Sequence, residues 1–148
     1  MVRQSIAGRG EFMSDRYQLE NLTRALFKAR DANDAAATMA YFHPDCIFQI
    51  KGGASLSPFT HKVFGKQALS TVMEGLAATW DFSAVEMTRT LIDGDTVVVC
   101  RKGGVVHVPS NSRIDTEWVD IFTVKEGLIV AFDEFVDTQL VAEVVGKT

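Results

Sequence analysis

Two acidic residues in the last third of the chain stand where the surrounding pattern favours apolar side chains. Asp120 and Glu134 lie in the run 116–138, which predicts two strands joined by a short turn at Lys125-Glu126-Gly127. Because side chains alternate along a strand, both carboxylates share one sheet face with Trp118, Phe122, Val130, Phe132 and Val136. An ionised carboxylate on such a face costs free energy unless it is paired, hydrogen-bonded or neutralised. Asp120 and Glu134 are therefore the first candidates for acid/base chemistry.

The predicted pairing across the turn brings these two carboxyls close together. A three-residue turn makes Val124 and Leu128 partners and leaves Asp120 and Glu134 as diagonal neighbours, with Cβ atoms under about 8 Å apart. At that separation the two groups can share a proton, which raises one pKa and suits a general acid or base near neutral pH. The alternative is that Glu134 forms a structural ion pair with a basic residue on a neighbouring strand, such as Arg101 or Lys102.

The elements that position these residues follow from hydrophobic periodicity and turn signals. Three helices are predicted, at about 14–31, 34–43 and 65–80. Asp34 caps the second helix, and Pro44 ends it because the residue before a proline disfavours helical geometry. Strands are predicted at 46–50, 84–92, 96–101 and 105–108 and in the final hairpin. This order predicts an α+β fold with the helices packed against one face of a curved, mostly antiparallel sheet.

Composition narrows the classes of function. A chain of 148 residues with 47% hydrophobic content is expected to form one domain with a substantial core. The net charge of −4 argues against a nucleic-acid partner, and no apolar run approaches the ~18–20 residues of a membrane span. We interpret residues 1–13 as an N-terminal extension or an expression remnant and 14–148 as the domain. Cys46 and Cys100 lack CxxC spacing, which favours buried thiols in a cytoplasmic protein.

The order of elements and several local signatures resemble the NTF2-like superfamily, and within it the SnoaL-like polyketide cyclases and ketosteroid-isomerase-like proteins. The residues that carry the resemblance are Asp34, Tyr41-Phe42-His43-Pro44-Asp45, Gly65, the run 92–98 and the run 119–138. The resemblance implies an NTF2-like cone, with three N-terminal helices packed on the curved sheet around a deep apolar pocket. It also implies a homodimer through the outer sheet face, for which the apolar candidates are Val119, Ile121, Ile129, Ala131 and Phe135.

The resemblance can be tested residue by residue for steroid isomerisation. Those enzymes use an aspartate base on the first strand, a tyrosine on the first helix and a late-strand aspartic acid. Alignment through Asp34 and Asp45 puts Ile50 where the base should be and Leu26 where the tyrosine should be, and Asp120 alone matches. A true ketosteroid isomerase is therefore not expected. SnoaL-like cyclases rely on a single pocket aspartate, which corresponds to Asp120, with an acidic residue on the closing strand near Glu134.

Three functions remain open after this comparison. The first is an enzyme that acts on a small hydrophobic carbonyl compound by carboxyl-mediated proton transfer, as a cyclase, isomerase or dehydratase does. The second is a non-catalytic module that binds a small ligand or a protein. The third resembles limonene-epoxide hydrolases, which need two aspartates bridged by an arginine, and Asp120 and Arg101 could contribute to that arrangement.

The residues expected to contact a small hydrophobic ligand are Trp118, Phe132, Phe48, Ile50, Phe122 and His61. His61 lies in the loop before the third helix, where it either contacts the ligand or is solvated. The histidines at 43, 61 and 107 have no metal-ligand spacing, and no nucleotide-binding motif occurs. The sequence therefore predicts neither a metal nor a cofactor.

Overall fold

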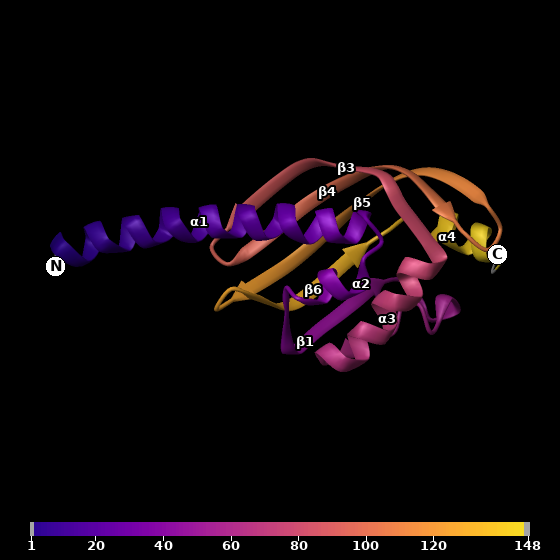
Figure 1. Ribbon diagram of the computed structural model, residues 1–148, viewed down its shortest axis with the longest axis horizontal. Helices are drawn as coiled ribbons and strands as arrows, with labels where there is room; N and C mark the ends of the chain where they lie inside the picture. Colours follow the sequence, from indigo (N-terminus) through magenta and orange to yellow (C-terminus); the bar gives the residue numbers. More distant parts are fainter. Residues whose placement is uncertain (1, 147–148) are drawn as a thin grey trace.

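The computed structural model describes the backbone of residues 2–146 and the side chains of residues 15–146. Its centre is a curved, unclosed six-stranded sheet, along one side of which the first three helices lie (Figure 1). The strands are β1 (Phe42–Lys51), β2 (Val63–Phe64), β3 (Trp80–Asp93), β4 (Thr96–His107), β5 (Ser112–Lys125) and β6 (Leu128–Phe135), in the spatial order β2-β1-β6-β5-β4-β3. Only the β1–β6 pair is parallel within the described chain. The predicted α+β class is therefore confirmed.

The described residues contain four α-helices rather than three. They are α1 (Val2–Asp31), α2 (Ala35–Met39), α3 (Lys66–Thr79) and α4 (Thr138–Val145). The fourth follows the sheet and lies at the end of the molecule where the chain terminates (Figure 1). The Asp137 side chain begins α4 by accepting a hydrogen bond from the Leu140 amide, and Gly146 ends it in the left-handed conformation. None of the described helices is both long and apolar enough to cross a membrane.

Several element boundaries differ from the predicted ones. The first helix begins at Val2 instead of Ser14 or Asp15, and the division of the chain at residue 13 stays a prediction. The predicted runs 96–101 and 105–108 are one strand, β4, which passes through Gly103-Gly104 without a break. A side chain at Gly103 would clash with the Ala84 carbonyl of β3, so glycine permits the close approach of these two bent strands.

The hairpin between β5 and β6 has a different register from the predicted one. Its turn contains two residues, Glu126 and Gly127, with φ angles of 54° and 79°. Two left-handed residues define the turn type whose twist matches that of the flanking strands. Asp120 therefore lies directly opposite Glu134 instead of diagonally to it.

A β-bulge in β6 explains why the faces predicted for Ile129 and Val130 are wrong. Pairing skips Val130, so that Val124 faces Ile129 and Thr123 faces Ala131. The extra residue shifts the phase of the strand by one position. Ile129, expected on the outer face, is fully buried in the core, whereas Val130, expected on the inner face, is only half-buried.

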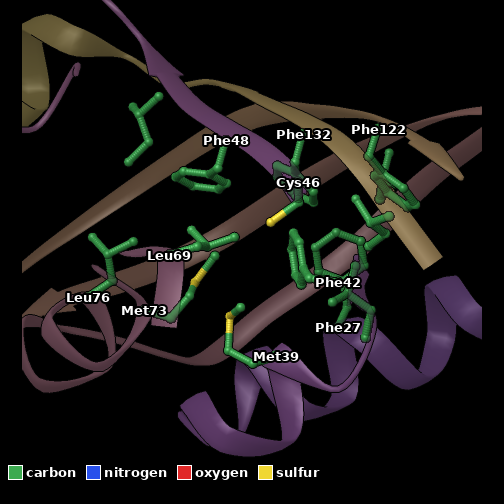
Figure 2. Close-up of a cluster of buried hydrophobic side chains, with 14 of the residues drawn as sticks. Phe27, Met39, Phe42, Cys46, Phe48, Leu69, Met73, Leu76, Phe122 and Phe132 are labelled. Atoms are coloured by element: carbon green, nitrogen blue, oxygen red, sulfur yellow. The ribbon is translucent and has the colours of Figure 1, made fainter. Parts of the chain in front are cut away.

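Aromatic rings fill the core between the sheet and the helices. Phe48, Phe132 and Phe122 come from adjacent strands and stack in a row, with ring centroids 5.5 and 5.3 Å apart (Figure 2). Phe27 of α1 meets Phe122 edge to face at 6.3 Å. This row fixes the position of β6 between β1 and β5, and with it the position of Glu134.

The two-residue turn can be tested by a pair of substitutions. Glu126→Asn should raise the free energy of unfolding by a few tenths to about 1 kcal/mol, because asparagine tolerates left-handed backbone better than glutamate does. Gly127→Ala should lower it by about 1–2 kcal/mol, since alanine pays the steric penalty of a positive φ. Urea denaturation measures both changes. A stabilising Gly127→Ala substitution would contradict the assigned turn.

Candidate active site

The two candidate carboxyls lie side by side in the core. Asp120 of β5 is 1% exposed and Glu134 of β6 is 5% exposed, and they occupy paired positions on neighbouring strands. The Oδ1 atom of Asp120 is buried and has no hydrogen-bond partner among the described residues. Burial above all, and then the charge of Glu134 and a hydrogen bond with it, raise the pKa of Asp120 well above its usual value. Burial and the neighbouring Glu134 therefore disfavour the ionised form of Asp120 relative to that of an exposed aspartate.

The nearest cation to Glu134 comes from α1 and not from a neighbouring strand. Arg30 places Nη2 3.7 Å from Oε2 of Glu134, and both side chains are more than nine-tenths buried. The distance exceeds that of a hydrogen bond, so the contact is one of charge. The Arg30 guanidinium also lies 4.8 Å above the Phe82 ring. Glu134 therefore does pair with a basic residue, as the alternative to a functional role predicts, but the partner is Arg30 of α1 and not Arg101 or Lys102 of a neighbouring strand.

Arg101 instead holds the end of α1. It donates two hydrogen bonds to the carboxylate of Asp31, one of them from Nη1 to Oδ2 at 3.1 Å. Its guanidinium lies 4.2 Å above the Phe27 ring, and its buried Nε has no hydrogen-bond partner in the described part of the chain. Arg101 therefore does not bridge two aspartates at the Asp120 site, although its charge opposes the rise in the pKa of Asp120.

Sequence reasoning missed Arg30 and Asp31, although a signal was present. Leu26 and Phe27 belong to the buried stripe of α1, and Arg30 and Asp31 follow them by four residues each. Residues four apart lie on the same face of a helix. The stripe therefore ends in two charged side chains that point toward the sheet. Their spacing could have predicted that they have charged partners on the sheet.

A small cavity adjoins the carboxyl pair. Its volume is about 50 Å³, which has room for a few water molecules but lies far below the ~300–1,000 Å³ of ligand pockets. Glu134 and Arg30 line it, together with a mostly apolar wall that includes Trp118, Ile50 and Phe82. Asp120 is not among the lining residues. Of the pair, Glu134 is thus the carboxyl at the cavity, and Asp120 lies behind it on the core side. Asp137 also lines the cavity, but its side chain caps α4 by accepting a hydrogen bond from the Leu140 amide.

The other candidate residues are distributed over two places. Phe122 and Phe132 belong to the buried aromatic row and line no described cavity. Phe48 and His61 line a second hollow of about 420 Å³ between β1, α3 and α4, and Ile50 lines both this hollow and the small cavity. The structure therefore brings Asp120, Glu134, Trp118 and Ile50 together. Within the described part of the chain no group of three or more acidic, histidine or cysteine side chains could hold a metal ion.

The fold defines an NTF2-like protein, the description given to several solved structures that it resembles. A SnoaL-like domain model matches residues 23–132. The chain therefore belongs to the SnoaL-like domain family. No protein of curated function matches the sequence.

Three solved structures illustrate how widely this fold is used. A candidate isomerase from Bacillus subtilis has 13% identity and a TM-score of 0.80, over 90% of this chain and 96% of that one. TerC, crystallised with polyporic acid, has 15% identity and a TM-score of 0.74, over 87% and 98%. An LEH-like epoxide hydrolase from M. tuberculosis has 19% identity and a TM-score of 0.67, over 88% and 97%. At these identities the likeness shows the fold alone.

Burial of Asp120 makes stability depend on pH. The raised pKa in the folded state means that its contribution to stability is complete below its unfolded pKa of about 3.9 and is lost as the pH rises through the folded pKa. Asp120→Asn removes this titration while keeping the shape. The stability of the variant relative to wild type should therefore increase between pH 4 and pH 8, as measured by urea denaturation.

Asp115→Asn, at an exposed position of the same strand, is the matched control and should show no such trend. A large loss of stability in Asp120→Asn would contradict this prediction. If Asp120 were half of a structural ion pair, the substitution would destabilise the protein by ~3–5 kcal/mol at neutral pH.

Proposed function

We propose that this protein is an enzyme that moves a proton on a small hydrophobic carbonyl compound, with Asp120 and Glu134 as a coupled acid/base pair. The observation that carries the proposal is the placement of the pair. Among the described residues Asp120 forms no ion pair of its own. It lies opposite Glu134, its pKa is raised by burial and by the charge of Glu134, and Glu134 lies at the cavity. A carboxyl pair that shares one proton is suited to general acid/base work near neutral pH.

The roles of the two carboxyls follow from their positions. Ionised Glu134, at the cavity wall, accepts a proton from the carbon next to the carbonyl group of the ligand. Asp120 holds the shared proton behind it and sets how readily Glu134 gains or gives one up. The guanidinium of Arg30, 3.7 Å from Glu134, is positioned to stabilise the negative charge that develops on the carbonyl oxygen. Return of the proton to another carbon of the conjugated system completes an isomerisation. In a cyclisation the enolate carbon instead attacks a second carbonyl carbon of the same molecule, and the proton returns to the alkoxide oxygen that this bond formation leaves.

Epoxide hydrolysis is a second candidate that one observation favours. The cavity beside Glu134 and Arg30 has room for water, and ring opening needs an acid, a base and a water molecule in one place. Against it, Arg101 is committed to Asp31 and bridges no second carboxyl at the site. Proton transfer on a carbonyl compound needs only groups that the cavity already contains, so we prefer it.

A screen of ketones, enones and epoxides against three variants tests the proposal. Asp120→Asn and Glu134→Gln should each lower kcat/KM by ~10²–10⁴-fold, the usual contribution of a placed acid or base. Asp115→Asn, which removes an exposed carboxylate from the same strand, should leave it unchanged. Turnover that survives both core substitutions would exclude the acid/base pair, and ligand binding without turnover would identify a binding module instead.

We also propose that the protein forms a homodimer through the outer face of the sheet. The support is an apolar surface on the side of the sheet that faces away from α1, α2 and α3. Its apolar members are Ile47, Leu91, Val98, Val119, Ile121, Ala131 and Phe135, of which Ile47, Leu91 and Phe135 are 39–48% exposed. Asp133, opposite Ile121, and Gln49 lie on the same face and give it a polar part. An apolar surface of this kind typically marks an interaction site.

Phe135→Glu tests the dimer, because a charge on this surface cannot be desolvated cheaply. Sedimentation velocity at micromolar concentration should show a dimer for wild type and a monomer for the variant. Val108→Glu, at an apolar residue that is 51% exposed and lies beyond the end of β4, is the control and should remain dimeric. A monomeric wild type would remove the proposal.

A further inference from the structure

The hollow of about 420 Å³ is continuous in its lining with the small cavity. The two share Ile50, Phe59, Leu76, Trp80 and Val141. Its remaining walls come from β1, residues 56–63, α3 and α4, and apart from His61 and Thr79 they are apolar or glycine. Phe48 of β1 and Leu76 of α3, both seen in Figure 2, belong to these walls. We call this hollow the α3 groove.

Gly75 is the unexpected residue of the α3 groove. It lies within α3, between the buried residues Met73 and Leu76, where glycine lowers helix stability relative to alanine. Its φ angle is not positive, so the backbone does not require glycine. A Cβ atom built at this position meets no heavy atom within 4 Å, so packing does not require glycine either. Gly75 is exposed and lines the groove, so the missing side chain leaves space at the solvent side of the groove.

The groove is large enough to hold a small molecule, whereas the small cavity is not. A volume of about 420 Å³ falls within the ~300–1,000 Å³ of small-molecule sites, whereas the cavity alone does not. A ligand whose carbonyl group reaches Glu134 has two neighbouring hollows for an extension. The other one, of about 500 Å³, adjoins the small cavity through Thr116 and Asp137 and is lined by Lys102, Asp115 and Glu117, so an apolar extension favours the groove. The shared residues lie between the small cavity and the groove, so a ligand that spans both displaces some of them; the half-buried Phe59 comes from a loop and Val141 from the short helix α4.

We propose that the α3 groove, kept open by Gly75, is the subsite for the apolar tail of an elongated carbonyl compound whose polar end lies at Glu134 and Arg30. This inference rests on the proposed function, because it takes the cavity beside Glu134 as the site of the carbonyl group. It adds the shape of the substrate: a ketone or an enone with an extended aliphatic or aromatic tail. Gly75 is then a determinant of specificity and takes no part in proton transfer.

Methyl ketones of five to eleven carbon atoms are the probes. Binding is followed by calorimetry and by the fluorescence of Trp80, which lines both spaces. In wild type each added methylene should tighten Kd by about fourfold once the chain enters the groove, the effect of burying one such group. Gly75→Leu fills the groove. It should bind the shortest ketones as wild type does and should lose the dependence on chain length for the longer ones.

Gly75→Ala is the matched control. It adds one methyl group where space is free and improves helix propensity as leucine does, so both variants should be folded. The alanine variant should keep most of the chain-length dependence. If Gly75→Leu binds long ketones as wild type does, or if no ketone of the series binds to wild type, the groove is not the subsite.

The two proposals fail in different ways. Binding that depends on chain length without turnover would overturn the acid/base chemistry and leave the groove intact. Turnover that is lost in Glu134→Gln but is indifferent to chain length and to Gly75→Leu would overturn the groove and leave the chemistry intact.

Discussion

The interior of this protein is organised around two carboxyl groups that face each other across the β5–β6 hairpin. Removing both Asp120 and Glu134 from water is costly, and their mutual repulsion adds to the cost. The fold meets this constraint by raising the pKa of Asp120, which makes its neutral form easier to reach, and by bringing Arg30 to Glu134. A slip of β6 by one residue against β5 would turn Glu134 to the outer face and separate it from Asp120. The two-residue turn and the bulge at Val130 are therefore part of the site.

The end of α1 links the fold to the chemistry. Its consecutive residues Arg30 and Asp31 meet Glu134 of β6 and Arg101 of β4. A buried ion pair adds little net stability, but loss of one partner is costly, so the pair of Asp31 and Arg101 resists displacement of the helix. That anchoring holds Arg30 beside the cavity. The same residue can then serve as the counter-charge of Glu134 at rest and as the group that meets a developing negative charge.

How far the sequence could predict this arrangement differs from element to element. The hairpin, the inward position of Asp120 and Glu134 and the α+β class follow from alternation and turn signals, which are local properties. The register does not, because a two-residue turn and a bulge at Val130 change the phase without a clear mark in the composition. The partners of Glu134 and Arg101 lie 70 residues or more away in the chain, on α1, and no local rule could pair them. The roles of Phe122 and Phe132 could not be predicted either. The alternation shows that their side chains point inward, but an inward side chain can fill the core as well as line a cavity.

The most direct measurement of the central claim is the titration of the Asp120 carboxyl itself. Carboxyl carbons labelled with ¹³C can be followed by NMR from pH 3 to pH 9, with the Asp120→Asn variant to assign the signal. We expect the Asp120 resonance to move at a pH clearly above the value of about 3.9 for a free aspartate. Glu134→Gln should shift this transition toward the free value, because the charge of Glu134 is one of the causes that raise the Asp120 pKa. A resonance that titrates at or below the free value, and is indifferent to Glu134→Gln, would contradict the coupled pair on which the proposed chemistry rests.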